Sequence, residues 1–369
     1  MSTYDPKATY IPILKAKSGE LSALGELANL TSKKVIPLLE IPRPQWDFVN
    51  EAPLETSAQL LSRIIPLIEK NWGKRPFFLD VYKDPLLSPK EKDTDLVDVF
   101  ATSLNDKELN YIPVISFDYS RSYNKSIVEK LSNTTTGCAL RVTISPDDSF
   151  EEDDYNTLLK DVGLEPSQVD LILDLGSVYR DGAEAVYLAY RLILAETPHI
   201  KAWRNLIIAA SSFPKGVGSL VEVNGNKRFP RSEWLGWTKL ASYKKLSRLP
   251  IFADYSVSHP EVFDDVDPRH MKLSGAIRYT TADEWLIVKG ERLTGKGSKG
   301  YDQFHELAKK LVDSGYFREN ASWGDKFILD CSNPEGSVGT GNLTTWRKVG
   351  NSQHIEFVIQ QLAKISENA

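Results

Sequence analysis

Eight short apolar runs recur along the first 255 residues, and each ends in a polar or charged residue. The runs are YIPILK, VIPLLE, PFFLD, YIPVISFD, CALR, VDLILD, NLIIAASS and LPIFAD. Most are continuously apolar rather than alternating, which is typical of parallel strands buried on both faces. The segments between them have the spacing of amphipathic helices. Eight βα units in about 250 residues predict an α/β fold, a (β/α)8 TIM-like barrel.

The chain after the eighth run has a different pattern. AIRYTTADEWLIVKG predicts a β-hairpin, YDQFHELAKKLVDSGYF a helix, FILDCS a short strand, NPEGSVGTGN a glycine-rich loop and HIEFVIQQLAKI a terminal helix. We therefore expect a barrel over residues 1–262 and a C-terminal extension over residues 263–369 that packs on it.

The residues that end the runs are the first candidates for a functional site, because (β/α)8 enzymes build their sites at the C-terminal ends of the strands. They are Lys15, Glu40, Asp80, Asp118, Arg141, Asp174, Ser212 and Asp254. Side chains alternate along a strand, and each charged residue shares its face with an apolar residue deeper in the run, as Asp254 does with Phe252. We therefore expect one charged layer inside the barrel, with Asp118 (or Ser116) and Ser212 completing it.

Carboxylates exceed cations in this layer, and buried charges are costly unless they are paired. Glu40, Asp80, Asp174 and Asp254 are candidate ligands for Mg²⁺ or Mn²⁺ in metal-assisted hydrolysis. A second hypothesis is metal-free catalysis, in which two of the same carboxylates act as acid and base on a glycoside or a related bond. A closed layer of salt bridges that only fixes the barrel register is the third.

Further residues extend the candidate site. Lys15, Lys17 and Arg141 are expected to bind an anionic group, and Asp118 and Ser212 to contact the ligand. His259 follows the eighth run and is a candidate general base or metal ligand, or an ordinary loop histidine. Arg231, in FPRSEW, either reaches over the barrel mouth or belongs to a helix start with a packing tryptophan.

Composition narrows the function classes. The chain has 369 residues, is 41% hydrophobic and carries a net charge of −5, which disfavours a general nucleic-acid binder. Cys138 and Cys331 show no metal-like spacing and read as reduced thiols. No signal pattern and no apolar run of about 20 residues is found, so we expect a cytoplasmic protein without a membrane partner.

The segments YIPILKAKSGELSAL, VIPLLEIP, FADYSVSHPE, IRYTTADEWLIVKG and TWRKVGNSQHI resemble the phage T4 beta protein family, whose members are called beta family proteins. The resemblance covers essentially the whole chain and implies a role in phage–host conflict, such as phage defence. It transfers no catalytic residue.

Two functions follow as expectations. The first is a barrel that binds or hydrolyses a small anionic ligand, nucleotide-like or phosphorylated; whether it is an enzyme stays open. The second is a non-catalytic recognition or scaffold protein of a phage-defence system. It would bind a phage, host or neighbour-encoded protein through its loops and the region from Trp346 to His354.

Overall fold

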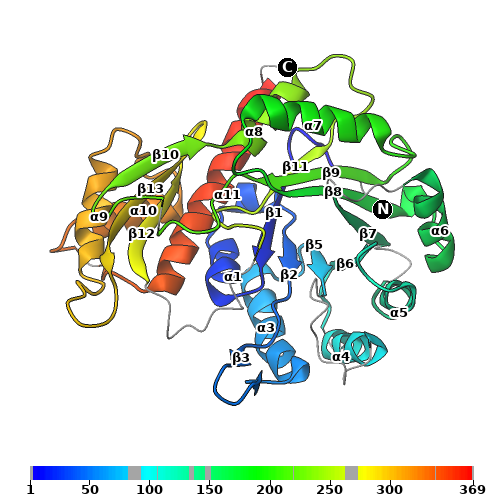
Figure 1. Ribbon diagram of the computed structural model, residues 1–369, viewed down its shortest axis with the longest axis horizontal. Helices are drawn as coiled ribbons and strands as arrows, with labels where there is room; N and C mark the ends of the chain where they lie inside the picture. Colours follow the sequence, from blue (N-terminus) through cyan, green and yellow to red (C-terminus); the bar gives the residue numbers. More distant parts are fainter. Residues whose placement is uncertain are drawn as a thin grey trace.

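The eight predicted strands form a closed parallel barrel in the computed structural model (Figure 1). The structure describes residues 3–81, 93–105, 107–132, 137–145, 151–218, 220–261, 273–336 and 338–367. Around the barrel the strands are β1 (Tyr10–Lys15), β2 (Leu38–Glu40), β5 (Phe77–Asp80), β6 (Tyr111–Ser116), β7 (Cys138–Thr143), β8 (Val169–Ser177), β9 (Asn205–Ser211) and β11 (Ile251–Asp254), which returns to β1. The predicted fold class is confirmed.

Helices follow the strands in the order that the sequence predicts and cover the outside of the barrel. They are α1 (Ser18–Gly25), the short α2 (Asn29–Ser32), α3 (Ser57–Trp72), α4 (Asp93–Asn105), α5 (Arg121–Leu131), α6 (Glu152–Val162), α7 (Ala183–Glu196), α8 (Ser232–Ala241) and α11 (Leu343–Glu367). A 3₁₀ turn, Pro166–Gln168, precedes β8, and a two-stranded hairpin of β3 (Trp46–Asp47) and β4 (Ala52–Pro53) follows β2. Pro66 lies inside α3, which continues through it for its full sixteen residues.

Side-chain alternation divides the barrel core into two layers. Ile11, Ile13, Leu38, Phe78 and Ile172 point into the lumen and form one apolar cluster. The alternate strand residues face the helices and join a larger cluster. Both faces of every strand are therefore apolar over most of its length, which explains why the runs in the sequence do not alternate.

A second sheet packs beside the barrel (Figure 1). It contains β10 (Asn226–Pro230), β13 (Glu284–Arg292) and β12 (Ser274–Thr280), in that order, and all pairs are antiparallel. The helices α9 (Gln303–Val312) and α10 (Trp323–Cys331) complete this part. The hairpin prediction is confirmed, whereas FILDCS was wrongly predicted as a strand and lies largely in α10.

The last helix, α11, runs between the barrel and the second sheet (Figure 1). It packs against α1 and β1 on one side and against β12 and α10 on the other. The predicted boundary at residues 262 and 263 lies outside the described residues, and the division into two parts stays a prediction. None of the described helices combines the length and the apolarity needed to cross a membrane.

Candidate functional site

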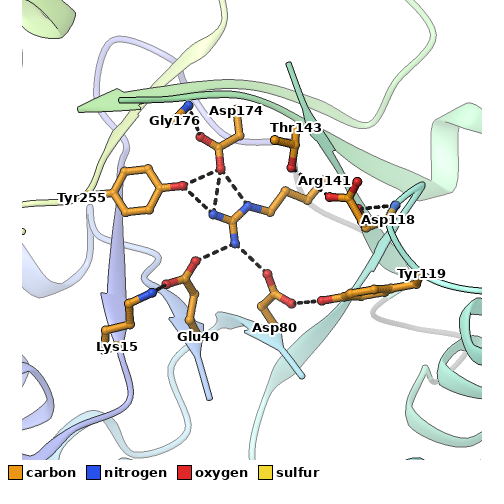
Figure 2. A network of polar contacts seen from close by, with 11 residues as sticks. Lys15, Glu40, Asp80, Asp118, Tyr119, Arg141, Thr143, Asp174, Gly176 and Tyr255 are labelled. Carbon is orange, nitrogen blue, oxygen red and sulfur yellow. Dashed lines mark hydrogen bonds and ion pairs between the residues drawn. The ribbon is translucent and has the colours of Figure 1, made fainter. Parts of the chain in front are cut away.

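Arg141 occupies the centre of a charged layer at the C-terminal end of the barrel lumen (Figure 2). Its Nη1 lies 2.8 Å from Glu40 Oε1 and 2.6 Å from Asp80 Oδ2. Its Nε and Nη2 lie 2.9 and 2.7 Å from Asp174 Oδ2. The same layer contains Lys15, which is ion-paired with Glu40. We call Lys15, Glu40, Asp80, Arg141 and Asp174 the charged layer.

Two tyrosines complete this network. The hydroxyl of Tyr255 accepts a hydrogen bond from Arg141 Nη2 at 2.7 Å and donates one to Asp174 Oδ2 at 2.6 Å. Tyr119 donates to Asp80 Oδ1 at 2.6 Å. Burial opposes the charge of Arg141, but Tyr255, Asp174 and the other two carboxylates outweigh burial and raise the pKa of Arg141 well above its usual value. The guanidinium is therefore charged, and together with Lys15 it offsets two of the three carboxylate charges in the layer.

The position that a metal ion would take among these carboxylates is filled by the guanidinium of Arg141. Within the described ranges, no three His, Cys, Asp or Glu side chains form a group that could hold a metal ion. The predicted role of these carboxylates as ligands of Mg²⁺ or Mn²⁺ stays a prediction. The closed layer of ion pairs is the arrangement present.

Asp254 does not belong to the charged layer, so its predicted facing is wrong. Ala253 and Tyr255 point into the lumen, whereas Phe252 packs outward against Trp234 and Trp237 of α8. The prediction was wrong because the strand residues are apolar on both faces. An apolar residue such as Phe252, two positions before Asp254, therefore does not identify the side that faces the lumen. Tyr255 takes the lumen position that was predicted for Asp254.

Asp254 instead joins the barrel to the last helix. It accepts hydrogen bonds from the Tyr10 hydroxyl and the Ser256 amide, and its Oδ2 lies 2.9 Å from His354 Nε2. On the other side of the imidazole, Nδ1 lies 2.9 Å from the hydroxyl of Thr280. Burial lowers the pKa of His354 although Asp254 opposes the shift, so the neutral ring donates to Asp254 and accepts from Thr280.

Ser212 and Arg231 lie in a neighbouring buried cluster, away from the barrel lumen. The Ser212 amide donates to Glu233 Oε2 at 2.9 Å, and its hydroxyl accepts from Trp285 Nε1 at 2.9 Å. Arg231 is fully buried, and its Nη1 donates to Gln361 Oε1 at 2.7 Å and to the carbonyl of Thr281 at 3.1 Å. Arg231 therefore does not reach over the mouth.

Glu233 makes this cluster sensitive to pH. Burial raises the pKa of its carboxyl to about 7, and Arg231 only partly opposes the shift. A raised folded-state pKa means that stability is lost as the pH rises from the unfolded value of 4.5 toward 7. Glu233→Gln keeps the acceptor for Ser212, so we expect it to be about 2 kcal/mol more stable than wild type at pH 8. At pH 5 this difference should fall below about 1 kcal/mol.

Urea unfolding of both proteins at the two pH values measures this effect. The exposed Glu184→Gln is the control, and its stability should follow wild type at both pH values. Identical pH profiles for wild type and Glu233→Gln would contradict the assignment.

Asp118 is exposed at the rim of the barrel rather than in the layer. Its Oδ2 accepts a hydrogen bond from the Thr143 hydroxyl at 3.0 Å (Figure 2). The lumen position in β6 belongs to Ser116, the alternative that the sequence offered, and Ser116 caps Asp118 by accepting its amide hydrogen at 3.2 Å.

A pocket of about 390 Å³ lies at the C-terminal ends of β1, β9 and β11, and we call it the mouth pocket. It is lined by Lys15, Lys17, Ser18, Gly19, Glu20, Phe213, Pro214, Lys215, Ser258, His259, Arg278, Leu343, Thr344 and Arg347. Of the predicted site residues, it brings together Lys15, Lys17 and His259. Lys15 belongs to both the charged layer and the mouth pocket, because it pairs with Glu40 and also lines the pocket.

Five cationic side chains line this pocket, and one carboxylate, Glu20, lines it with them. Lys15 pairs with Glu40, Lys215 with Glu261, and Arg347 with Glu20 at 3.5 Å. Arg278 has no carboxylate within ion-pairing distance in the part of the chain that the structure describes; its Nη1 donates to the carbonyl of Val257 at 3.1 Å. Burial and the nearby Arg347 lower the pKa of Arg278 well below its usual value. The pocket therefore holds uncompensated positive charge.

His259 lies at the pocket wall with both ring nitrogens engaged. Its Nδ1 accepts from the Glu261 amide at 3.1 Å, which leaves the proton on Nε2, 2.9 Å from the Ser177 hydroxyl. Burial lowers its pKa, although Glu261 opposes the shift, and the ring is therefore neutral near pH 7. Its predicted role as general base stays a prediction.

Sequence reasoning missed Lys215 and Arg278 and gave Arg347 a different place. Lys215 follows the seventh run by a few residues, so its position beyond a strand end was an available signal. Arg278 comes from β12, and no local pattern connects that hairpin to the barrel mouth. Trp346 and His354 were expected on a partner surface, but they are 6% and 0% exposed and pack inside the molecule.

Comparison with known proteins agrees with the resemblance seen in the sequence. Protein beta of Enterobacteria phage P4 is 24% identical over 379 residues, covering 98% of this chain and 95% of that protein. The phage of this relative is P4 rather than T4. A crystal structure of the enoyl reductase domain of MlnA, from the macrolactin cluster of Bacillus amyloliquefaciens, covers 96% of this chain and 80% of its own. It has a TM-score of 0.33 and 10% identity, which is too low to carry an argument.

The family model described as Beta protein matches residues 10–360, from the first barrel strand into the last helix. The matched range contains the charged layer, the mouth pocket and the Asp254–His354 contact. The chain belongs to the Beta protein family.

Proposed function

We propose that this protein binds a small anionic ligand in the mouth pocket and acts through that binding in phage–host conflict. The observation that carries the proposal is the convergence of Lys15, Lys17, Lys215, Arg278 and Arg347 on one pocket at the C-terminal end of the barrel. This is the end at which (β/α)8 proteins bind their ligands.

The charge arrangement supports an anion rather than a neutral ligand. Burial lowers the pKa of Arg278 first, and the positive charge of the nearby Arg347 lowers it further. An anion between them removes this repulsion and forms charge-assisted hydrogen bonds, which are stronger than neutral ones. The pocket volume of about 390 Å³ lies within the usual range for small-molecule sites.

The charged layer meets the pocket at Lys15. Lys15 is fixed by Glu40, which Arg141 in turn holds, so one cation of the pocket is oriented by the ion-pair network. A fixed donor loses less conformational entropy when a ligand binds. We therefore assign the layer a positioning role for the pocket rather than a role in bond cleavage.

Binding without hydrolysis is the function that we propose. Glu40, Asp80 and Asp174 are held by Arg141, and the Nδ1 lone pair of His259 accepts the Glu261 amide. A general base needs a free lone pair within hydrogen-bond reach of the proton that it removes. The phage P4 relative supports the biological setting.

Arg278→Gln tests the proposal. The glutamine amide can still donate to the Val257 carbonyl, so the fold should persist, but the positive charge of the partly buried Arg278 is gone. We expect the affinity for inorganic phosphate, sulfate or citrate to fall about tenfold or more in isothermal titration calorimetry. Protection of bacteria against phage, measured as plating efficiency, should fall with it.

The matched control is Arg228→Gln on β10, which removes an exposed arginine of the same sheet. It should bind anions and protect like wild type. Equal anion binding by wild type and Arg278→Gln, with both proteins folded, would contradict the proposal.

A further inference from the structure

We infer that the ligand is a phosphate monoester, whose dianionic phosphate lies at the N-terminal turns of α1 and α11, between Arg278 and Arg347. The inference rests on the proposed function, because it names the ligand class of the same pocket. Four features of the pocket carry it.

The first feature is the open start of α1. Lys17 precedes the helix in an extended conformation, and no side chain caps the first turn. Within the described ranges, the amides of Ser18, Gly19 and Glu20 donate to no protein acceptor; the first bonded amide is that of Leu21, to the Lys17 carbonyl at 3.0 Å. Unpaired amides at a helix start point outward and carry the positive end of the helix dipole. This arrangement binds phosphate groups in many proteins.

The second feature is a second helix start at the same pocket. The amide of Thr345 donates to Asn342 Oδ1 at 3.0 Å, whereas the amides of Leu343 and Thr344 donate to no described residue. The two starts are in direct contact at Gly19. A Cβ atom there would lie 2.9 Å from Arg347 Cβ and 3.0 Å from the Thr344 carbonyl oxygen, so the approach requires glycine.

The third feature is the pair of guanidinium groups. Arg347 Nη1 donates to Ser258 Oγ at 2.9 Å and to the Val257 carbonyl at 3.2 Å, the same carbonyl that Arg278 contacts. The Nε and Nη2 groups of Arg278 donate to no residue that the structure describes. Planar guanidinium donors match the oxygens of a phosphate in pairs.

Charge identifies the ligand as a dianion. Arg278 and Arg347 bring two positive charges, Glu20 removes one, and the two helix starts add roughly half a charge each. Lys15 and Lys215 are balanced by Glu40 and Glu261. About two positive charges thus remain, even with Lys17 left out, and a phosphate monoester above pH 6 carries nearly two negative ones.

The fourth feature is room for an organic group. A water molecule takes about 30 Å³ of liquid, so a pocket of about 390 Å³ is far larger than one phosphate needs. Phe213, Pro214 and Leu343 provide apolar wall on the same pocket. A phosphate ester with a small apolar or aromatic group fills both parts.

Phenyl phosphate and phenyl sulfate test the inference, because they share shape and differ in charge. We expect phenyl phosphate to bind at least tenfold more tightly at pH 7.5, measured by isothermal titration calorimetry. Its advantage should shrink as the pH falls to 5, because the second phosphate pKa lies near 6. The charged and titratable groups of the pocket are Lys15, Lys17, Glu20, Lys215, His259, Arg278 and Arg347. Their titration acts on both esters, so the ratio of the two affinities isolates the ligand charge.

Ser18→Pro removes one amide donor without changing any charge. Proline is favoured at the first helical position, and Lys17, with φ −104° and ψ 159°, already has the conformation preferred before proline. We expect phenyl phosphate affinity to fall several-fold while the melting temperature stays at the wild-type value. Ser18→Ala, which keeps the amide, is the control and should bind like wild type.

The outcomes separate the two proposals. Equal affinity for the two esters at all pH values, or an unchanged affinity in Ser18→Pro, would overturn the monoester assignment and leave anion binding intact. Failure of both esters to bind, together with no effect of Arg278→Gln on any anion, would overturn both.

Discussion

Replacing Arg141 by methionine is expected to destabilise the folded protein by about 3–5 kcal/mol at pH 7.5, because it leaves buried carboxylates without their cation. Glu40, Asp80 and Asp174 all accept hydrogen bonds from this one guanidinium, and methionine fills similar space without any donor. The measurement is the free energy of unfolding in urea. A loss of this size is far above the effect of a typical surface substitution.

The pH dependence of this variant has a definite sign. Burial favours the neutral, protonated form of a carboxyl that has lost its cation. A raised pKa gives stability that is present at low pH and lost as the pH rises. The deficit relative to wild type should therefore grow between pH 5 and pH 8.

Two controls separate the layer from a general charge effect. Lys239→Met removes a cation paired with Glu184 at the surface, and exposed pairs contribute only about 0–1 kcal/mol. Adding Glu40→Gln, Asp80→Asn and Asp174→Asn to Arg141→Met should recover part of the lost stability, since the buried carboxylate charges are then gone and only the partly exposed Lys15 stays charged. An Arg141→Met protein as stable as wild type would show that the layer does not depend on its central cation.

The barrel itself was predictable because its strands are short, apolar and regularly separated by helical segments. The segment FPRSEW was offered as a helix start with a packing tryptophan, and α8 does begin at Ser232 with Trp234 buried. The same continuous apolarity hid which face of each strand points inward, as Asp254 demonstrates. Local propensity also misassigned Phe327 to Cys331, because a short apolar run does not distinguish a strand from a buried helix turn.

Only the part of the candidate site that follows the barrel strands could be predicted from the sequence, because the rest comes from elements outside the barrel. Lys15 and Lys17 follow a barrel strand, so the position of a strand end was sufficient to nominate them. Arg278 and Arg347 enter the same pocket from β12 and α11, and only the packing of α11 between barrel and second sheet brings them there. Contacts between elements so distant in the chain leave no periodic or local signal in one sequence.

Asp254→Ala is expected to lower the free energy of unfolding by about 3 kcal/mol or more, because it leaves several buried donors without an acceptor. The carboxylate accepts from the Tyr10 hydroxyl, the Ser256 amide and His354 Nε2, and so connects β1 and β11 with α11. Urea unfolding measures the loss. Exposed Asp118→Ala is the control and should change stability by no more than about 0.5 kcal/mol.

The contact between Asp254 and His354 also contributes to the pH dependence of wild-type stability. Burial by itself raises the pKa of Asp254, but His354 and Tyr10 outweigh burial, so the pKa of Asp254 lies below its usual value. The pKa of His354 is also lowered, in this case by burial. For a group with a lowered folded-state pKa, stability is present above the unfolded pKa and lost as the pH falls. This contact should therefore contribute less stability below about pH 6.5, first through His354 and then, below about pH 4, through Asp254, whereas Glu233 acts in the opposite direction between pH 4.5 and 7.

A double-mutant cycle tests whether Asp254 acts through His354. In Asp254→Ala with His354→Leu, the combined loss should be smaller than the sum of the single losses by about 1 kcal/mol or more, since the two side chains form one hydrogen-bonded unit. Strictly additive losses would contradict a direct coupling of Asp254 with His354. Because α11 also carries Arg347, a loosened helix should in addition weaken anion binding in the mouth pocket, which calorimetry on the folded Asp254→Ala protein measures independently of its stability.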